Sequence, residues 1–154
     1  MNLFIAMFGG LVLSVAPLSD ANNMGQVISV SVETDGSFYH EFRELRFAQQ
    51  TLMVRKSDLK TFATANAPAC KRLERDVIAL YRDDAFRNLA AIGTSRHLDR
   101  VKTMLALKIQ PPDGTKVDTV FVQSDSNSEP RVVASISEAL SICEREAEKF
   151  ATTS

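Results

Sequence analysis

The sequence predicts a single α+β domain. We expect an antiparallel sheet of two hairpins, four or five strands in all, with two or three helices packed on one face, in the order ββ(β)αα-ββα. Three observations support this fold class. Two segments alternate between apolar and polar residues, turn residues follow each of them, and two other segments repeat apolar residues at helical spacing. A chain of 154 residues suits one domain that folds without a metal.

The composition is that of an ordinary globular protein, with 45% hydrophobic and 24% charged residues. A net charge of −1 indicates no general attraction to nucleic acid or to an anionic membrane. Residues 71–108 hold nine Lys or Arg and five Asp or Glu, whereas residues 109–154 hold four and eight. We expect this basic middle and acidic end to be solvated or to pair with each other.

The N-terminus carries an uncharged apolar run at residues 3–18 (LFIAMFGGLVLSVAPL). It is shorter than the roughly 20 residues that span a bilayer and close to the apolar core of a secretory signal. Small residues at Ser19 and Ala21 fit a cleavage site between Ala21 and Asn22. The sequence therefore predicts a signal peptide at residues 1–21, a domain at 22–154, and a periplasmic or secreted protein. Because no Lys or Arg precedes the run, an uncleaved anchor and a buried core element are the alternatives.

The first hairpin begins with residues 26–33, where Ile28, Val30 and Val32 alternate with polar residues as in a half-buried strand. An Asp-Gly pair within residues 34–37 predicts the turn. The aromatic segment 38–47 is interpreted as the return strand, although its apolar residues also fit a helical stripe. Residues 51–55 are expected to add a short third strand.

Two helices are expected next. Ser57 and Asp58 favour a short helix that ends near Ala65. The long helix at residues 68–92 is the central element, and it has a buried stripe at helical spacing: Leu73, Val77, Leu80 and Tyr81. Asp83 and Asp84 interrupt this stripe, and we interpret them as N-cap residues at a bend or a new helix start.

The C-terminal half repeats the hairpin-then-helix pattern. Residues 101–109 alternate as a strand, residues 111–114 (Pro-Pro-Asp-Gly) form a turn, and residues 116–122 return as the partner strand. Pro130 suits the first turn of a closing helix. Its expected buried stripe is Val133, Ile136, Leu140 and Cys143.

Only two cysteines are present, Cys70 on the long helix and Cys143 on the closing helix. Their spacing fits neither a redox nor a zinc motif, and two ligands cannot complete a structural zinc site. In an exported chain, two cysteines most simply form one disulfide. The alternative is a pair of buried free thiols in a cytosolic protein.

Histidine is scarce, with only His40 and His97. His40 is interpreted as a plain strand residue. His97 lies in the loop Ser-Arg-His-Leu-Asp-Arg at residues 95–100, whose sequence neighbours do not converge as a catalytic triad does. We expect Arg96, His97 and Arg100 to form a contact for an anion or a protein partner.

The sequence contains no phosphate-binding glycine loop, no nucleophile elbow and no metalloprotease motif. It therefore indicates no cofactor, no metal site and no nucleic-acid partner, and it sets no oligomeric state. The leading hypothesis is an exported, non-catalytic domain that binds a protein partner or serves in an envelope assembly through its sheet edges and basic loop. The alternatives are a small hydrolase that uses His97, and a membrane-tethered protein whose N-terminal segment is retained.

Overall fold

The computed structural model describes residues 24–36, 38–87, 89, 101–125 and 129–152. Its elements follow the order ββββαββα, which confirms the α+β class. They are β1 (Gln26–Gly36), β2 (Tyr39–Arg46), β3 (Thr51–Arg55), β4 (Leu59–Ala63), α1 (Pro68–Arg82), β5 (Lys102–Gln110), β6 (Asp118–Asp125) and α2 (Arg131–Ala151). The described residues thus form six strands, not four or five, and two helices.

All six strands form one antiparallel sheet in the order β4-β3-β2-β1-β5-β6. The first four strands are a meander, and the second hairpin adds to it beside β1. At the centre of the sheet, Val30 of β1 pairs with Leu45 of β2 on one side and with Leu107 of β5 on the other. A register shift between Val27 and Ser29 leaves Ile28 as an extra, bulged residue.

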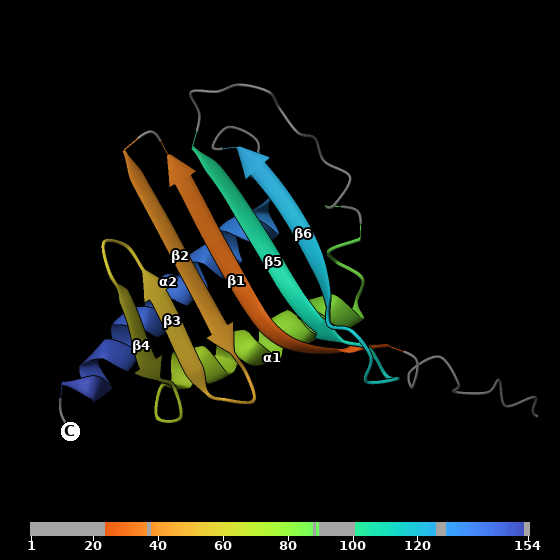
Figure 1. The fold of residues 1–154 in the computed structure, drawn as a ribbon, viewed down its shortest axis with the longest axis horizontal. Helices are drawn as coiled ribbons and strands as arrows, with labels where there is room; N and C mark the ends of the chain where they lie inside the picture. The colour runs from red at the N-terminus through yellow and green to blue at the C-terminus, as the bar shows by residue number, and fades with distance from the viewer. Residues whose placement is uncertain (1–23, 37, 88, 90–100, 126–128, 153–154) are drawn as a thin grey trace, which may run out of the picture.

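Both helices lie behind the same face of the sheet (Figure 1). Val30, Leu105 and Leu107 point from the sheet toward them and are buried. The closing helix α2 supplies the four residues expected for its buried stripe, all of them in the core: Val133, Ile136, Leu140 and Cys143. The hydrophobic core is therefore a single layer between one sheet face and two helices.

The first hairpin is confirmed as two strands, but its turn lies later than expected. Asp35 and Gly36 remain in β1, where they pair with His40 and Tyr39 of β2. Within residues 38–47, Tyr39–Arg46 is strand and not helix, because β2 lies between β1 and β3. The third strand has the expected bounds, Thr51–Arg55.

The predicted helix from Ser57 to Ala65 is wrong, since β4 occupies Leu59–Ala63. Ser57 and Asp58 form the tight turn between β3 and β4, with the Ser57 hydroxyl 3.0 Å from the Asp58 carboxylate. Serine and aspartate stabilise turns as well as helix starts. Pairing with β3 then decides the conformation of a segment too short to be a stable helix.

The predicted role of Asp83 and Asp84 as N-caps is also wrong. Helix α1 ends at Arg82, ten residues before the predicted end at 92, and Asp83 is its C-cap. Asp84 has a positive φ of 61°, a conformation that aspartate tolerates better than most residues. The left-handed conformation of Asp84 departs from the helix, which therefore ends here although negative charge is unfavourable at a helix C-terminus.

The second hairpin and the closing helix are confirmed, with β5 and β6 joined through the expected turn. Gly114 in that turn has a φ of 68° and donates its N–H to the Pro111 carbonyl. Cys70 and Cys143 form a disulfide that joins α1 to α2. The predicted signal peptide at residues 1–21 lies outside the described residues.

Candidate interaction surface

The predicted contact residues Arg96, His97 and Arg100 lie outside the described residues, so their role stays a prediction. The described part of the chain offers a different surface, the sheet face that points away from the helices. We call it the outer face. It is formed by the alternate strand residues that do not enter the core.

The outer face carries more large apolar side chains than a purely solvated sheet face requires. Phe121 on β6 is 54% exposed and Leu59 on β4 is 58% exposed. Phe42, Met53 and Met104 are half-buried on the same face. No helix among the described residues covers this face (Figure 1).

A compact ion cluster occupies the centre of the outer face around Glu44. One carboxylate oxygen of Glu44 lies 2.6 Å from Lys108 Nζ and accepts a hydrogen bond from the Ser29 hydroxyl at 3.3 Å. The other oxygen lies 2.9 Å from the Arg46 guanidinium. These three side chains cover Glu44 so well that its side chain is only 2% exposed, although no helix lies above it.

Burial alone would raise the pKa of Glu44. The hydrogen bonds and positive charges of Lys108 and Arg46 outweigh burial and hold the pKa of this carboxyl below its ordinary value. Glu44 is therefore ionised at neutral pH. It fixes two cationic side chains in place at the middle of the sheet.

His40 lies on the outer face near the start of β2. Its Nε2 is 3.3 Å from the Glu33 carboxylate and 3.1 Å from Arg55 Nη2, and its Nδ1 is 3.8 Å from Asp35. The Arg55 guanidinium also lies 5.6 Å from the centre of the Phe42 ring. His40 is a strand residue, as expected, and its ring takes part in a polar network on the outer face.

A second charged group is buried on the helix side, between β2 and α2. Arg43 Nε lies 2.7 Å from Glu144, and Arg43 Nη1 lies 2.9 Å from Glu41. Lys56, in the turn after β3, reaches the other oxygen of Glu144 at 2.9 Å. These ion pairs connect α2 to the sheet at Glu144, which is acidic although it lies on the buried side of the helix.

Burial acts against both charges of this pair, and the pair overcomes it. Burial alone would lower the pKa of Arg43, but the hydrogen bonds and charges of Glu144 and Glu41 raise it above the ordinary arginine value. Burial alone would raise the pKa of Glu144, but Arg43 and Lys56 hold it below the ordinary glutamate value. Arg43 and Glu144 are therefore both charged at neutral pH.

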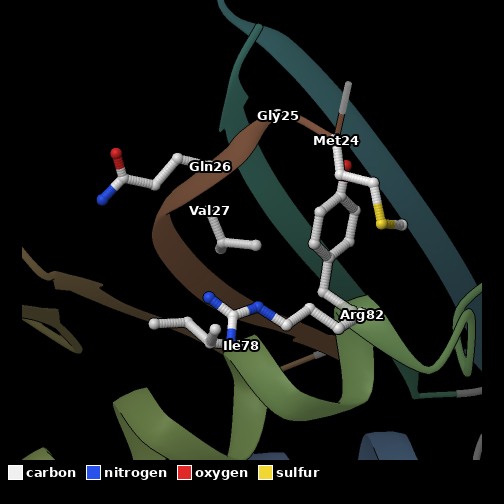
Figure 2. Close-up of a pocket in the computed structure, with 7 residues that line it drawn as sticks. Met24, Gly25, Gln26, Val27, Ile78 and Arg82 are labelled. Carbon is white, nitrogen blue, oxygen red and sulfur yellow. The ribbon is translucent and has the colours of Figure 1, made fainter. Parts of the chain in front are cut away.

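A hollow of about 640 Å³ lies where β1 begins, against the end of α1. Figure 2 shows the Arg82 side chain crossing it toward Ile78, with Val27 on the facing strand and Gln26 directed away. Gly25 is required beside it, because a Cβ there would lie 2.5 Å from Ile109 and 2.8 Å from the Gln110 carbonyl oxygen. Among the described residues, its lining includes no carboxylate, histidine or cysteine that could form a general acid–base pair.

No group of three or more His, Cys, Asp or Glu side chains within the described ranges is arranged to hold a metal ion. Neither described helix is both long and apolar enough to cross a bilayer. Comparison with known proteins found no matching family model, no matching curated protein and no matching solved structure.

Two charged clusters, one on each face of the sheet, escape sequence reasoning. Glu44 is surrounded by residues from three strands, and its closest cation, Lys108, is 64 residues away. On the helix side, Glu144 pairs with Arg43 across 101 residues. A usable signal existed only for Glu144, because it lies four residues after Leu140 and three before Ala147, on the buried stripe of α2.

Proposed function

We propose that this chain is an exported, non-catalytic domain that binds a protein partner through its outer face, as a component of an envelope assembly. The observation that carries the proposal is the uncovered sheet face with two exposed apolar residues, Phe121 and Leu59. The outer face also carries aromatic, methionine and arginine side chains, which are the types enriched in protein-binding surfaces. The Cys70–Cys143 disulfide is consistent with a periplasmic or secreted location, where disulfides persist.

Site-specific photocrosslinking in the native host tests the proposal. A photoreactive phenylalanine analogue in place of Phe121 stands on the outer face, and the same analogue in place of Ser135 stands on the exposed side of α2. We expect a protein adduct of defined mass from position 121 and none from position 135. Adding Leu59→Asp to the position-121 protein should weaken the adduct band, because a charge on this face must be desolvated when a partner binds.

Two results would argue against a partner on the outer face. The first is the absence of any adduct at position 121. The second is an equal adduct pattern at both positions, which indicates random collision.

A further inference from the structure

Strand β4 lies at the edge of the sheet, and the backbone groups on its outer side pair with no other described strand. Thr64 N–H donates to the Gln50 carbonyl at 2.8 Å, and Lys56 N–H donates to the Asp58 carbonyl at 3.4 Å. These two residue pairs continue the β3–β4 register at both ends. Hydrogen-bonded and non-hydrogen-bonded pairs alternate along an antiparallel ladder. The N–H and C=O groups that point away from β3 are therefore those of Leu59, Thr61 and Ala63.

Helix α2 extends beyond the sheet at this edge. It contacts β3 and β4, and its C-terminal turns reach past β4 in Figure 1. Between them lies a hollow of about 640 Å³, lined by β4 and by the last turns of α2: Lys60, Phe62, Arg145, Glu148, Lys149, Ala151 and Thr152. A smaller hollow of about 110 Å³ shares Lys60 and Glu148 and continues toward the Lys56–Asp58 turn. Together they form a groove along β4 at the place where a further strand would lie under the helix.

The lining of this groove indicates what kind of strand fits. Its larger part holds the cations Lys60 and Arg145 beside one anion, Glu148. Lys60 and Arg145 have no ion-pair partner within the described part of the chain. Phe62 supplies an apolar wall on the same side of β4 as Lys60, two residues away.

We propose that the groove between β4 and the C-terminal turns of α2 binds an extended segment of a protein partner, which adds to β4 as a seventh, antiparallel strand. The added strand presents an apolar side chain opposite Phe62 and, two residues later, an acidic side chain opposite Lys60. Main-chain hydrogen bonds to Leu59, Thr61 and Ala63 hold the segment, and its two side chains provide selectivity. This inference deepens the proposed function and rests on it, because it names a second part of the partner and the position where that part docks.

The test uses the whole protein and two short capped peptides of alternating threonine and valine. One peptide has glutamate two residues after the central valine, and the other has lysine there. NMR spectra of the backbone amides of the protein are recorded with each peptide at up to about 1 mM. We expect the amides of Leu59, Thr61 and Ala63 to shift and to gain protection from hydrogen exchange with the glutamate peptide. The lysine peptide should bind about fivefold to tenfold more weakly, because it brings like charges together.

Three variants make the result specific. Lys60→Glu should reverse the preference between the two peptides, and Arg131→Glu, at the far end of α2, should leave it unchanged. Thr61→Pro removes one outward donor without removing a bond to β3, and it should reduce binding of both peptides about tenfold.

Three outcomes would overturn the inference. The first is that the amides of Leu59, Thr61 and Ala63 do not shift at the highest peptide concentration. The second is that Lys60→Glu keeps the wild-type preference between the two peptides. The third is that the same amides are protected without peptide while the protein has twice its monomer mass, which would identify a second copy as the occupant. An adduct at position 121 in the photocrosslinking experiment, together with any of these results, would leave the proposed function standing and remove only the β4 groove. Shifts at β4 without an adduct at position 121 would reject the outer face instead.

Discussion

Two carboxylates are the most unusual residues of the described chain, because each is buried and ionised. Glu44 is satisfied by three side chains on a sheet face without a helical cover, and Glu144 by Arg43 and Lys56 beneath a helix. A buried charge is tolerated only when partners replace its lost hydration. Both clusters therefore depend on the sheet being assembled, since their members come from strands and a helix far apart in the chain.

The first prediction concerns acid stability. The pKa values of Glu44 and Glu144 are below the ordinary glutamate value of 4.5, so both groups bind protons more readily in the unfolded chain. Above this value both states are ionised, and the full stabilisation is present. As the pH falls below about 4.5, the unfolded state takes up protons first, and the free energy of unfolding decreases until the folded carboxyls are protonated too. Urea midpoints measured from about pH 7 to about pH 3 should fall accordingly.

Two variants distinguish the contribution of Glu44 to acid stability from the general effect of low pH on the protein. Glu44→Gln should lower the stability at neutral pH, because Lys108 and Arg46 lose their shared counter-charge, and it should flatten the decrease at low pH. Glu138→Gln changes an exposed residue of α2 and should keep the wild-type pH profile. If the free energy of unfolding of Glu44→Gln fell at low pH as much as that of the wild type, the cluster around Glu44 would not be the cause of the acid sensitivity.

At the level of elements, helix α1 depends on α2 for its start. Ala67 at the N-cap has no side chain that could cap the first turn. The Glu146 carboxylate of α2 accepts the Ala69 N–H at 2.6 Å, and the Cys70–Cys143 disulfide lies one residue further along α1. The first turn of α1 is therefore stabilised by a negative charge and a covalent bond that both come from the other helix.

The second prediction concerns this disulfide. Replacing both cysteines, Cys70→Ser with Cys143→Ser, should lower the free energy of unfolding by about 4 kcal/mol, because a loop of 73 residues is no longer closed in the unfolded chain. Urea unfolding of the oxidised wild type and of the double variant measures the difference. Reductant should destabilise the wild type by a similar amount and leave the double variant unchanged. Equal midpoints for both oxidised proteins would show that the bond adds no stability.

The elements were predictable where their signal was local. Alternation identified β1 and β5, and a helical stripe that includes Cys143 identified α2. The strand β4 was missed because Ser57 and Asp58 begin turns and helices equally well, and only pairing with β3 distinguishes the two. The true end of α1 was missed because Phe86 continues the apolar pattern beyond Arg82. In the structure Phe86 lies in the core although it follows the end of the helix.

At the level of the whole molecule, sequence reasoning found the layers but not the surfaces. The disulfide was foreseeable because two cysteines in an exported chain have one pairing. The β4 groove was not, since it combines Lys60 and Phe62 with Arg145 and residues near it, more than 80 positions away in the chain. A surface made by such distant segments leaves no spacing that a sequence pattern can reveal.

The last prediction joins the leader to the disulfide. If residues 1–21 are a signal peptide, the mature chain begins at Asn22, two residues before Met24, where the described structure starts. Gly25 lies close to Ile109 and Gln110, so the first described strand is anchored soon after the predicted cut, and all six described strands belong to the mature chain. Export also delivers the chain to an oxidising compartment, which the Cys70–Cys143 bond requires in order to persist.

The intact mass of the protein isolated from its native host therefore reports both events. We expect the mass of the chain from Asn22 to Ser154, lighter by the two hydrogens lost when the disulfide forms. Alkylation should add nothing before reduction and two groups after it, because no described cysteine is free. A chain that still begins at Met1 and is alkylated without reduction would place the protein in a reducing compartment. That result would remove the export on which the proposed envelope function depends, while the fold and the β4 groove would remain.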